Sequence, residues 1–483
     1  MAATATPGAP PRYQGFTTMP LGGAWRPGSS GKTAADADPW SGEILTEIRL
    51  ADHGDLDDAV TDAAQAQREW AARPPASRAE VMLAAAAVTR ARREEITDWL
   101  IRETGATVAR AELECNLARS AMLTAAGIPH QVTGRIVPSD RPGRQNRVFR
   151  VPAGVVGVIT PWTAPLRLSS RSVAPALAAG NAVILKPSSE APVTGGLLLA
   201  KIYQEAGLPA GLLSVLIGSG DEIGQALAGH PVPRVISFAG SAATGHALVR
   251  QSGGKRLAAE LCGTGPFVVL DDADLSRAVD AAVFGSFARQ DQFAAMAGRL
   301  IVDRKVYHDF TERFLAVVGC LRAGDPAAAD TDIGPVINAR QLGVIQDQLD
   351  RARGEGARQA LGGEPGGPSG LLLPPHVLLA GGQAGVRAGV RAGVRDEIAG
   401  PVAVVIRARD DQDALRIANQ AGPGPPGAVF TADVERGTRF ALGLGARMTH
   451  VNDSPVNDDA ATGPGGQHAI DQFTAESWVS VPY

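Results

Sequence analysis

The chain has 483 residues, of which 45% are hydrophobic and 20% are charged, and its formal net charge is −4. This composition is typical of a soluble globular protein, and the length predicts about two or three domains. The balanced charge argues against a nucleic-acid partner, and the lack of a long apolar run argues against secretion or a membrane span.

The three cysteines, Cys115, Cys262 and Cys320, lie far apart in the sequence. This spacing offers neither a disulfide framework nor a cluster of metal ligands. We therefore expect no metal site and a protein of the reducing cytoplasm.

Two helices are predicted near the N-terminus, over residues 55–70 and 77–102. In both segments apolar residues recur three and four positions apart, as on one face of a helix. Ser77 and Glu80 have the spacing of a capping box at the start of the second helix.

From residue 151 onward, short apolar runs alternate with helical stretches. The runs VVGVIT, AVILKP, LLSVLIG and VISFAG form one series, and FVVLDDADL, RLIVDR and PVAVVIRA form a second from Phe267. Alternating buried strands and helices indicate doubly wound parallel sheets, so we expect two α/β domains. The final segment, FTAESWVSVPY, alternates like a strand and would have to join a sheet elsewhere in the chain or in another subunit.

Six motifs in order resemble the aldehyde dehydrogenase superfamily, and most closely its benzaldehyde and salicylaldehyde dehydrogenase-like branch. They are TPWTAPLRLSSRSVAPALAAGNAVILKPSSEAPVTGG, AGLPAGLLSVLIG, FAGSAATG, AAELCGTGPFVVLDDADL, DEIAGPVAVV and HVNDSPVNDD. The resemblance implies the aldehyde dehydrogenase fold, with two doubly wound parallel-sheet α/β domains and a β-hairpin oligomerisation arm.

The resemblance also implies how the chain divides. An NAD(P)-binding-like domain is expected over residues 1–129 and 151–257, and a catalytic-like domain over 258–450. Residues 130–150 and 468–483 would form the arm, which in this family carries the terminal strand of a neighbouring subunit, and 451–467 a degenerate active-site loop. Members of the family are homodimers or tetramers, and the same is expected here.

Catalysis in this family needs a thiolate that attacks the aldehyde, donors for the oxyanion, NAD for the hydride and a carboxylate that activates water. The nucleophile motif corresponds to DQFAAMAGR, where counting back from Arg299 places Ala294 on the cysteine. A methyl group cannot attack a carbonyl carbon. Either the residue is a laboratory substitution in a working enzyme or the activity has been lost naturally.

Other departures favour natural loss. Thr163 replaces the asparagine that supplies an oxyanion donor, and Ala164 replaces a phenylalanine of the substrate tunnel. Ala399 replaces a phenylalanine beside the nicotinamide, and a glycine-rich segment near the C-terminus is reduced to residues 464–466. Several changes around one pocket suggest coordinated remodelling.

The cofactor motifs are partly retained. A turn of the form GSxxxG precedes a helix whose N-terminus would receive a pyrophosphate. Ser189 stands where many NAD-preferring members have glutamate, so NAD and NADP are not distinguished, and productive nicotinamide placement is doubtful. The residues expected at the cofactor are Trp162, Lys186, Ser189, Gly240, Ser241, Gly245 and Glu397.

Glu260 matches the family's general base, although it could instead be a paired or solvated structural carboxylate. Cys262, two residues later, is either a relocated nucleophile or a small buried hydrophobe. Asp291 could form a carboxylate pair with Glu260 or cap backbone N–H groups of a loop.

A small-molecule pocket is expected beside Ala164, Arg167 and Leu117. Arg167 lies where apolar or aromatic residues are usual, so it could hold an anionic ligand or point to solvent.

Three functions remain open at this stage. The first is a catalytically retired homologue that binds a ligand or partner. The second is an enzyme repurposed for non-redox acid/base chemistry with Glu260, in a biosynthetic pathway. The third is an NAD(P)-dependent aromatic aldehyde dehydrogenase, with an engineered Ala294 or with Cys262 as nucleophile. The sequence favours the first two, and we expect ordinary aldehyde oxidation to be absent.

Overall fold

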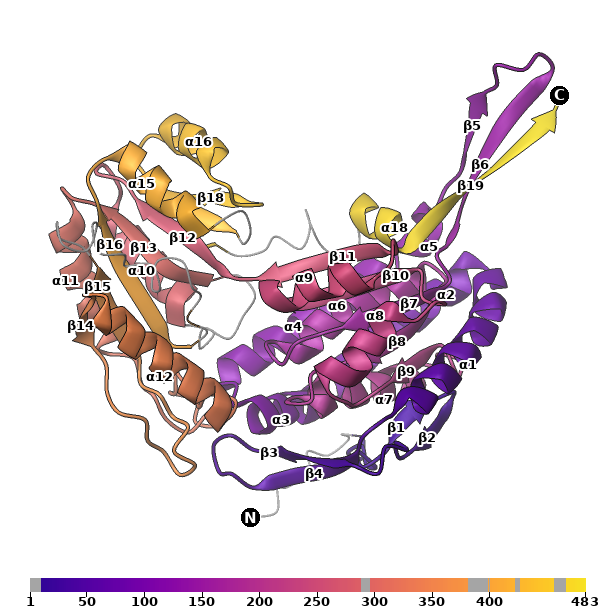
Figure 1. Cartoon of the computed structure of the whole chain (residues 1–483), viewed down its shortest axis with the longest axis horizontal. Helices are drawn as coiled ribbons and strands as arrows, with labels where there is room; N and C mark the ends of the chain where they lie inside the picture. Colours follow the sequence, from indigo (N-terminus) through magenta and orange to yellow (C-terminus); the bar gives the residue numbers. More distant parts are fainter. Residues whose placement is uncertain (1–9, 288–295, 381–397, 399, 422–425, 456–465) are drawn as a thin grey trace.

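A computed structural model describes residues 10–287, 296–380, 398, 400–421, 426–455 and 466–483. Two separate sheets, one parallel and one mostly parallel, are each covered by helices and form the body, and a three-stranded arm projects from it (Figure 1). Within these ranges, no helix is long and apolar enough to cross a membrane.

The first sheet is entirely parallel, with the strand order β11-β10-β7-β8-β9. Its strands match the first predicted series of apolar runs, because strands covered on both faces are continuously hydrophobic. Their bounds are β7 Val155–Ile159, β8 Ala182–Lys186, β9 Leu213–Val215, β10 Val235–Ser241 and β11 Arg256–Cys262.

Helices pack on both faces of this sheet and bury its core (Figure 1). The helices and helical turns of this part are α1 His53–Ala72, α2 Pro75–Ala91, α3 Arg93–Thr104, α4 Val108–Ala125, α5 Ile128–Gln131, α6 Pro165–Ala178, η1 Val193–Leu197, α7 Leu198–Glu205, η2 Gly220–Gly224, α8 Gln225–Gly229, α9 Ala242–Gln251 and α18 Gln467–Phe473. Two short hairpins accompany them, formed by β1 Met19–Leu21 with β2 Ala24–Arg26 and by β3 Thr33–Ala37 with β4 Ile44–Arg49.

The second sheet has the order β14-β15-β16-β13-β12-β17-β18, and only its β14–β15 pair is antiparallel. The chain passes from the first sheet to the second between Cys262 and Thr264. The bounds are β12 Thr264–Val269, β13 Met296–Asp303, β14 Arg358–Leu361, β15 His376–Ala380, β16 Val402–Ala408, β17 Gly427–Phe430 and β18 Thr449–Val451. Its helices are α10 Leu275–Phe287, α11 Tyr307–Val318, α12 Ala339–Gly354, α15 Asp411–Ala418, η3 Asn419–Ala421 and α16 Val434–Gly443.

The arm consists of β5 Arg135–Pro138, β6 Arg144–Pro152 and β19 Thr474–Pro482, in the order β19-β6-β5 (Figure 1). The C-terminal strand therefore pairs with β6 of its own chain, in antiparallel register from Thr474 opposite Pro152 to Pro482 opposite Arg144. This resolves the question of its partner left open by the sequence.

The prediction of one helix over residues 77–102 is wrong in two respects. First, α2 begins at Pro75, with a proline in its first turn and no side-chain cap, so the Ser77–Glu80 capping box does not form. Second, the helix is interrupted at Arg92, whose φ is −102° and ψ is 17°. The Arg92 side chain ion-pairs with Glu95 and Glu205, contacts that sequence periodicity does not reveal.

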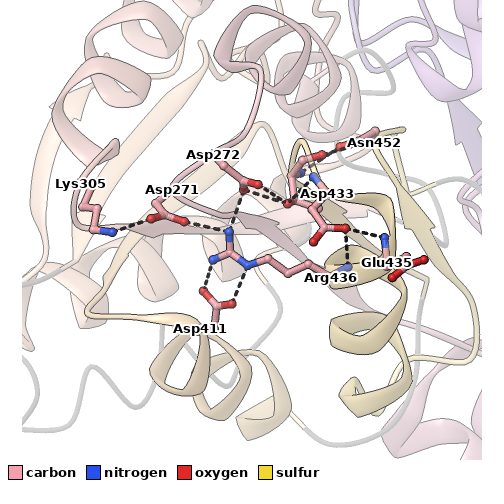
Figure 2. A network of polar contacts seen from close by, with 9 residues as sticks. Asp271, Asp272, Lys305, Asp411, Asp433, Glu435, Arg436 and Asn452 are labelled. Carbon is pink, nitrogen blue, oxygen red and sulfur yellow. Dashed lines mark hydrogen bonds and ion pairs between the residues drawn. The ribbon is translucent and has the colours of Figure 1, made fainter.

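Loops at the carboxyl ends of the second sheet's strands are held by an ion-pair network around Arg436 (Figure 2). Its guanidinium binds Asp411 through two hydrogen bonds of 2.6 and 2.8 Å and lies 2.9 Å from a carboxylate oxygen of both Asp271 and Asp272. Lys305 also binds Asp271, at 2.6 Å. These carboxylates raise the pKa of Arg436, so its charge ties α16 to the loops after β12 and β16.

Candidate active site

The loop between β7 and α6 carries three of the predicted site residues, Trp162, Thr163 and Ala164. Ala164 is the residue before α6 and has a φ of 47°, in the left-handed region that non-glycine residues seldom adopt. Such strain recurs at functional sites. Glu114 of α4 caps the start of α6, because its Oε1 accepts from the N–H of Leu166 at 2.9 Å and of Arg167 at 3.3 Å.

Thr163 presents a hydroxyl group with no hydrogen-bond partner among the residues that the structure describes. Its Oγ1 is buried, and Trp162 beside it is half-buried. A buried hydroxyl without a partner is costly unless a ligand or water satisfies it. Thr163 can therefore donate a hydrogen bond to a bound group.

Arg167 does not point to solvent, since only 4% of it is exposed. It lies near the buried carboxylate of Glu114, where Arg110 and Arg167 oppose the effect of burial, although burial still raises the pKa of Glu114. Leu117 is half-buried one turn further along α4. The predicted pocket residues on α4 and α6 thus belong to two helices that pack together, with charges between them.

Glu260 lies on β11, beside Ala239 of β10, and its carboxylate is bound by the guanidinium of Arg171 from α6. Both residues line a cavity of about 440 Å³ between α6, the edge of the first sheet and α18. Glu260 is accordingly a paired carboxylate that also borders open space. Its exposed side-chain fraction of 29% leaves room for water or a ligand.

The GSxxxG turn joins β10 to α9. Ser241 caps the helix by accepting from the N–H of Thr244 at 3.3 Å. A Cβ atom on Gly245 would lie 2.4 Å from Cδ2 of Leu261, and one on Gly240 would lie 2.6 Å from Cζ of Phe238, so neither position can hold a side chain without rearrangement. The turn presents a helix N-terminus with little side-chain cover, which suits a phosphate group. These residues fit a dinucleotide.

Lys186 is the last residue of β8, so it lies at the carboxyl ends of the first sheet's strands, as the Ser241 turn does. The N–H of Thr160, after β7, donates to the carbonyl of Lys186 at 3.2 Å, which keeps the ends of the two strands together. The ammonium is buried and donates to the carbonyl of Pro187 at 3.0 Å, and burial lowers its pKa to about 8 despite the opposing charge of Asp221. Ser189 is half-buried just beyond. A polar ligand at this edge would give the ammonium a better partner.

Not every predicted residue can be placed. Ala294, Asp291, Glu397 and Ala399 lie outside the described residues. Cys262 is the last residue of β11, with its backbone opposite Ser241. No group of three or more potential metal ligands occurs in the part of the chain that the structure describes.

Sequence reasoning missed two residues of this site, Arg171 and Glu114. Arg171 lies four residues after Arg167, on the same face of α6, and this spacing could have indicated it. Glu114 gave no local signal, because its role depends on α4 lying against the start of α6.

Comparison with known proteins places this site in context. The profile of the aldehyde dehydrogenase family matches residues 25–469. The chain belongs to the aldehyde dehydrogenase family. It is 41% identical over 476 residues to a vanillin dehydrogenase of Corynebacterium glutamicum, covering 95% of this chain and 96% of the relative.

Solved structures of this family share the fold. The crystal structure of an NAD-dependent benzaldehyde dehydrogenase from Corynebacterium glutamicum is 40% identical, with a TM-score of 0.89 and 97% of both chains covered. A betaine aldehyde dehydrogenase from Staphylococcus aureus, solved with NAD⁺, is 25% identical, with a TM-score of 0.91 and 97% of both chains covered.

These relatives correct two expectations. The interpretation of the chain as a retired or repurposed homologue is wrong, since relatives matched along nearly the whole chain are named as dehydrogenases of aromatic aldehydes. That interpretation gave a few motif positions more weight than the rest of the chain, and two of those positions, Ala294 and Ala399, lie outside the described residues. The doubt about the cofactor is likewise unsupported, because the family includes NAD-dependent enzymes and NAD complexes.

Proposed function

We propose that this protein is an NAD-dependent dehydrogenase that oxidises aromatic aldehydes to carboxylic acids. The observation that carries the proposal is the position of Glu260, which borders the cavity on the strand next to the one that ends in the phosphate-type turn at Ser241. A base and a dinucleotide turn at one sheet edge are what this chemistry requires. The names of the relatives supply the substrate class.

NAD would be held by the chain's own residues at this edge, with its pyrophosphate at the Ser241 turn and its adenosine ribose near Lys186. Bound there, it supplies the acceptor for the hydride that leaves the aldehyde carbon. Gly240 and Gly245 leave space for the phosphates, and Trp162, Ser189 and Glu397 are proposed to complete the site.

Cys262 is the proposed nucleophile. The other two cysteines suit the role poorly, because burial raises the pKa of Cys115 to about 11 and Cys320 lies beyond the end of α11 on the second sheet. The Cys262 thiolate would bond to the carbonyl carbon, and the carbonyl oxygen would become an oxyanion that accepts from the Thr163 hydroxyl.

Glu260 is the proposed general base of the second half-reaction. After loss of the hydride, the acyl group is a thioester on sulfur. Glu260 takes a proton from water, and the resulting hydroxide attacks the acyl carbon, which breaks the C–S bond and releases the acid and the thiolate. Glu260 then releases its proton to solvent, which restores the base.

The test is NADH formation by the purified protein with NAD and benzaldehyde, followed by fluorescence. We expect turnover in the wild type, loss in Cys262→Ser and Glu260→Gln, and no change in the matched control Cys320→Ser. Absence of NADH with several aromatic aldehydes would refute the proposed function. Full activity in Cys262→Ser together with loss in Glu260→Gln would refute only the assignment of the nucleophile.

The arm is the proposed contact between copies in a homodimer or tetramer. Its strands expose large apolar side chains, of which Ile136 is 67% exposed, Phe149 48% and Trp478 55%. Exposed apolar groups gathered on one projecting element indicate a protein interface. Light scattering of the wild type and of Phe149→Glu should give a smaller mass for the variant. An unchanged mass would argue against this interface.

A further inference from the structure

The cavity beside Glu260 is lined by an unusual excess of cationic side chains. Three arginines, Arg171, Arg256 and Arg447, line it, against two carboxylates, Glu260 and Asp471. The kind of ligand that the cavity can bind depends on which of these side chains already have an oppositely charged partner.

Both carboxylates have cationic partners. Glu260 is bound by Arg171. Asp471, on α18, is bound by Arg150 of β6 and also accepts from Nε2 of Gln467 at 3.0 Å. Neither carboxylate is therefore available to neutralise the remaining arginines.

Among the residues that the structure describes, Arg256 donates to neutral groups only. Its Nη1 lies 2.6, 2.9 and 2.7 Å from the carbonyl oxygens of Asp471, Gln472 and Thr474, at the C-terminal end of α18. These bonds fix the guanidinium and satisfy carbonyls of the last turn, but they leave a full positive charge at the cavity.

Arg447 is exposed, and within the described part of the chain it makes neither a hydrogen bond nor an ion pair. It precedes β18 of the second sheet and lines the same cavity as residues of α18 and β11. Among the described residues, neither Arg256 nor Arg447 has a carboxylate partner, so two positive charges act on this half-open cavity and attract an anion to it.

The rest of the wall is mixed, with Ser172, Ser237, His468 and Gln472 beside apolar residues, and the cavity is of suitable size. The apolar part includes Pro175, Phe238, Leu257, Ala469 and Phe473. A volume of about 440 Å³ accommodates a substituted benzene ring, within the range of ordinary small-molecule sites.

We propose that this cavity selects aromatic aldehydes that carry a carboxylate on the ring, with Arg447 as the specificity-determining residue. The inference rests on the proposed function and narrows its substrate class. The ring packs against the apolar part of the wall with its aldehyde toward Glu260, and the ring carboxylate meets the guanidinium of Arg447, with Arg256 adding to the positive field.

The experiment compares 4-formylbenzoate with benzaldehyde in the wild type, in Arg447→Met and in the control Arg439→Met, which removes an exposed arginine on α16. In the wild type we expect a KM for 4-formylbenzoate about 10-fold lower than that for benzaldehyde. This ratio corresponds to the free energy of one charge-assisted hydrogen bond. Arg447→Met should abolish the difference by raising the KM for 4-formylbenzoate to about that for benzaldehyde. Added salt should weaken the wild-type preference.

A binding measurement separates this inference from the proposed function. Terephthalate, titrated calorimetrically, should bind the wild type and Arg439→Met and should bind Arg447→Met about 10-fold more weakly. Turnover of benzaldehyde without any preference for 4-formylbenzoate would overturn the inference and leave the proposed function standing. Terephthalate binding that depends on Arg447, without turnover of any aldehyde, would support the cavity's selectivity and refute the dehydrogenase.

Discussion

The guanidinium of Arg171 on α6 binds the carboxylate of Glu260 on β11, which joins the helix to the edge strand of the first sheet at the wall of the cavity. Arg171 is only 8% exposed, so the pair is held from the buried side while Glu260 remains accessible. Arg171 is thus a positioning residue for the proposed base.

Replacing Arg171 should slow turnover more than it weakens substrate binding. In Arg171→Gln we expect kcat to fall about 10-fold, because a base that loses its orientation loses part of its 10²- to 10⁴-fold contribution. The KM for benzaldehyde should change little, and Arg171→Lys should restore part of kcat. Steady-state kinetics checks the split between kcat and KM. An equal loss in the Lys and Gln variants would contradict the positioning role.

Gly245→Ala should damage the dinucleotide turn. The added methyl would lie 2.4 Å from Cδ2 of Leu261 and 3.2 Å from Cε1 of Phe238, so α9 must move away from β10 and β11. We expect a loss of about 1–3 kcal/mol in unfolding free energy and weaker NAD binding. The control is Gly343→Ala in α12, where the new methyl would meet nothing within 4 Å beyond its chain neighbours and the backbone of its own helix, and a gain of up to ~1 kcal/mol is expected. Chemical denaturation with and without NAD measures the unfolding free energy and the affinity for NAD. An unchanged NAD affinity in Gly245→Ala would contradict the proposed role of the turn.

The strands and the glycine-containing turn at Ser241 were predictable because their signals are local. The run AVIL of β8 is apolar throughout, as buried parallel strands require, and Gly240 and Gly245 lie at the end of β10 and in the first turn of α9. The Arg171–Glu260 pair was not predictable, because 89 residues separate the partners and their contact depends on β11 lying at the edge beside β10.

Local signals also misled. Residues 77–102 contain no glycine or proline, so periodicity favours one helix, yet the chain bends at Arg92. There the side chain lies over the ring of Tyr13, 3.7 Å from its centre, and between two glutamates. Contacts from the distant N-terminal segment outweigh helix propensity, which is worth only tenths of a kcal/mol per residue.

Asp36 and Glu103 should make the protein less stable as the pH rises. Burial, and next the neighbouring Glu103, raise the pKa of Asp36 from 3.8 to about 10, and burial raises the pKa of Glu103 to about 7. The folded state therefore retains a proton that the unfolded state releases. Its stabilising effect is complete below pH of about 3.8 and is lost progressively as the pH rises toward about 10.

Asp36→Asn should remove much of this dependence. The variant should match the wild type near pH 4 and unfold at a higher temperature near pH 9, by about 1 °C for each kcal/mol relieved. Asp347→Asn, at an exposed position on α12, is the control. Melting temperatures measured across this pH range test the prediction. The same pH dependence of the melting temperature in the wild type and in Asp36→Asn would rule out the buried pair as the cause.

Arg436→Met should destabilise the second sheet's loops. The change removes the partner of Asp411 and leaves Asp271 and Asp272 without their shared guanidinium (Figure 2). We expect a loss of about 2 kcal/mol, the value of hydrogen bonds to charged groups. The exposed Arg439, 4.0 Å from Glu435, supplies the control Arg439→Met, with an effect below about 0.5 kcal/mol. Denaturant titration compares the two, and equal losses would show that the network adds nothing.

Lys186 should make NAD binding dependent on pH. Because burial lowers its pKa to about 8, the ammonium is charged at neutral pH and loses its proton as the pH rises through about 8. A neutral amine is a weaker donor to ribose hydroxyl groups, so the Kd for NAD should rise about 10-fold between about pH 7 and pH 9.5, the value of one hydrogen bond to a charged group. Lys186→Met should bind NAD about 10-fold more weakly at neutral pH, and its Kd for NAD should hardly change with pH.

The control Lys305→Met, at an ion pair on the second sheet, should behave like the wild type. Fluorescence titration with NADH provides the measurement, and a Lys186→Met profile with the same slope as the wild type would exclude Lys186 as the titrating group.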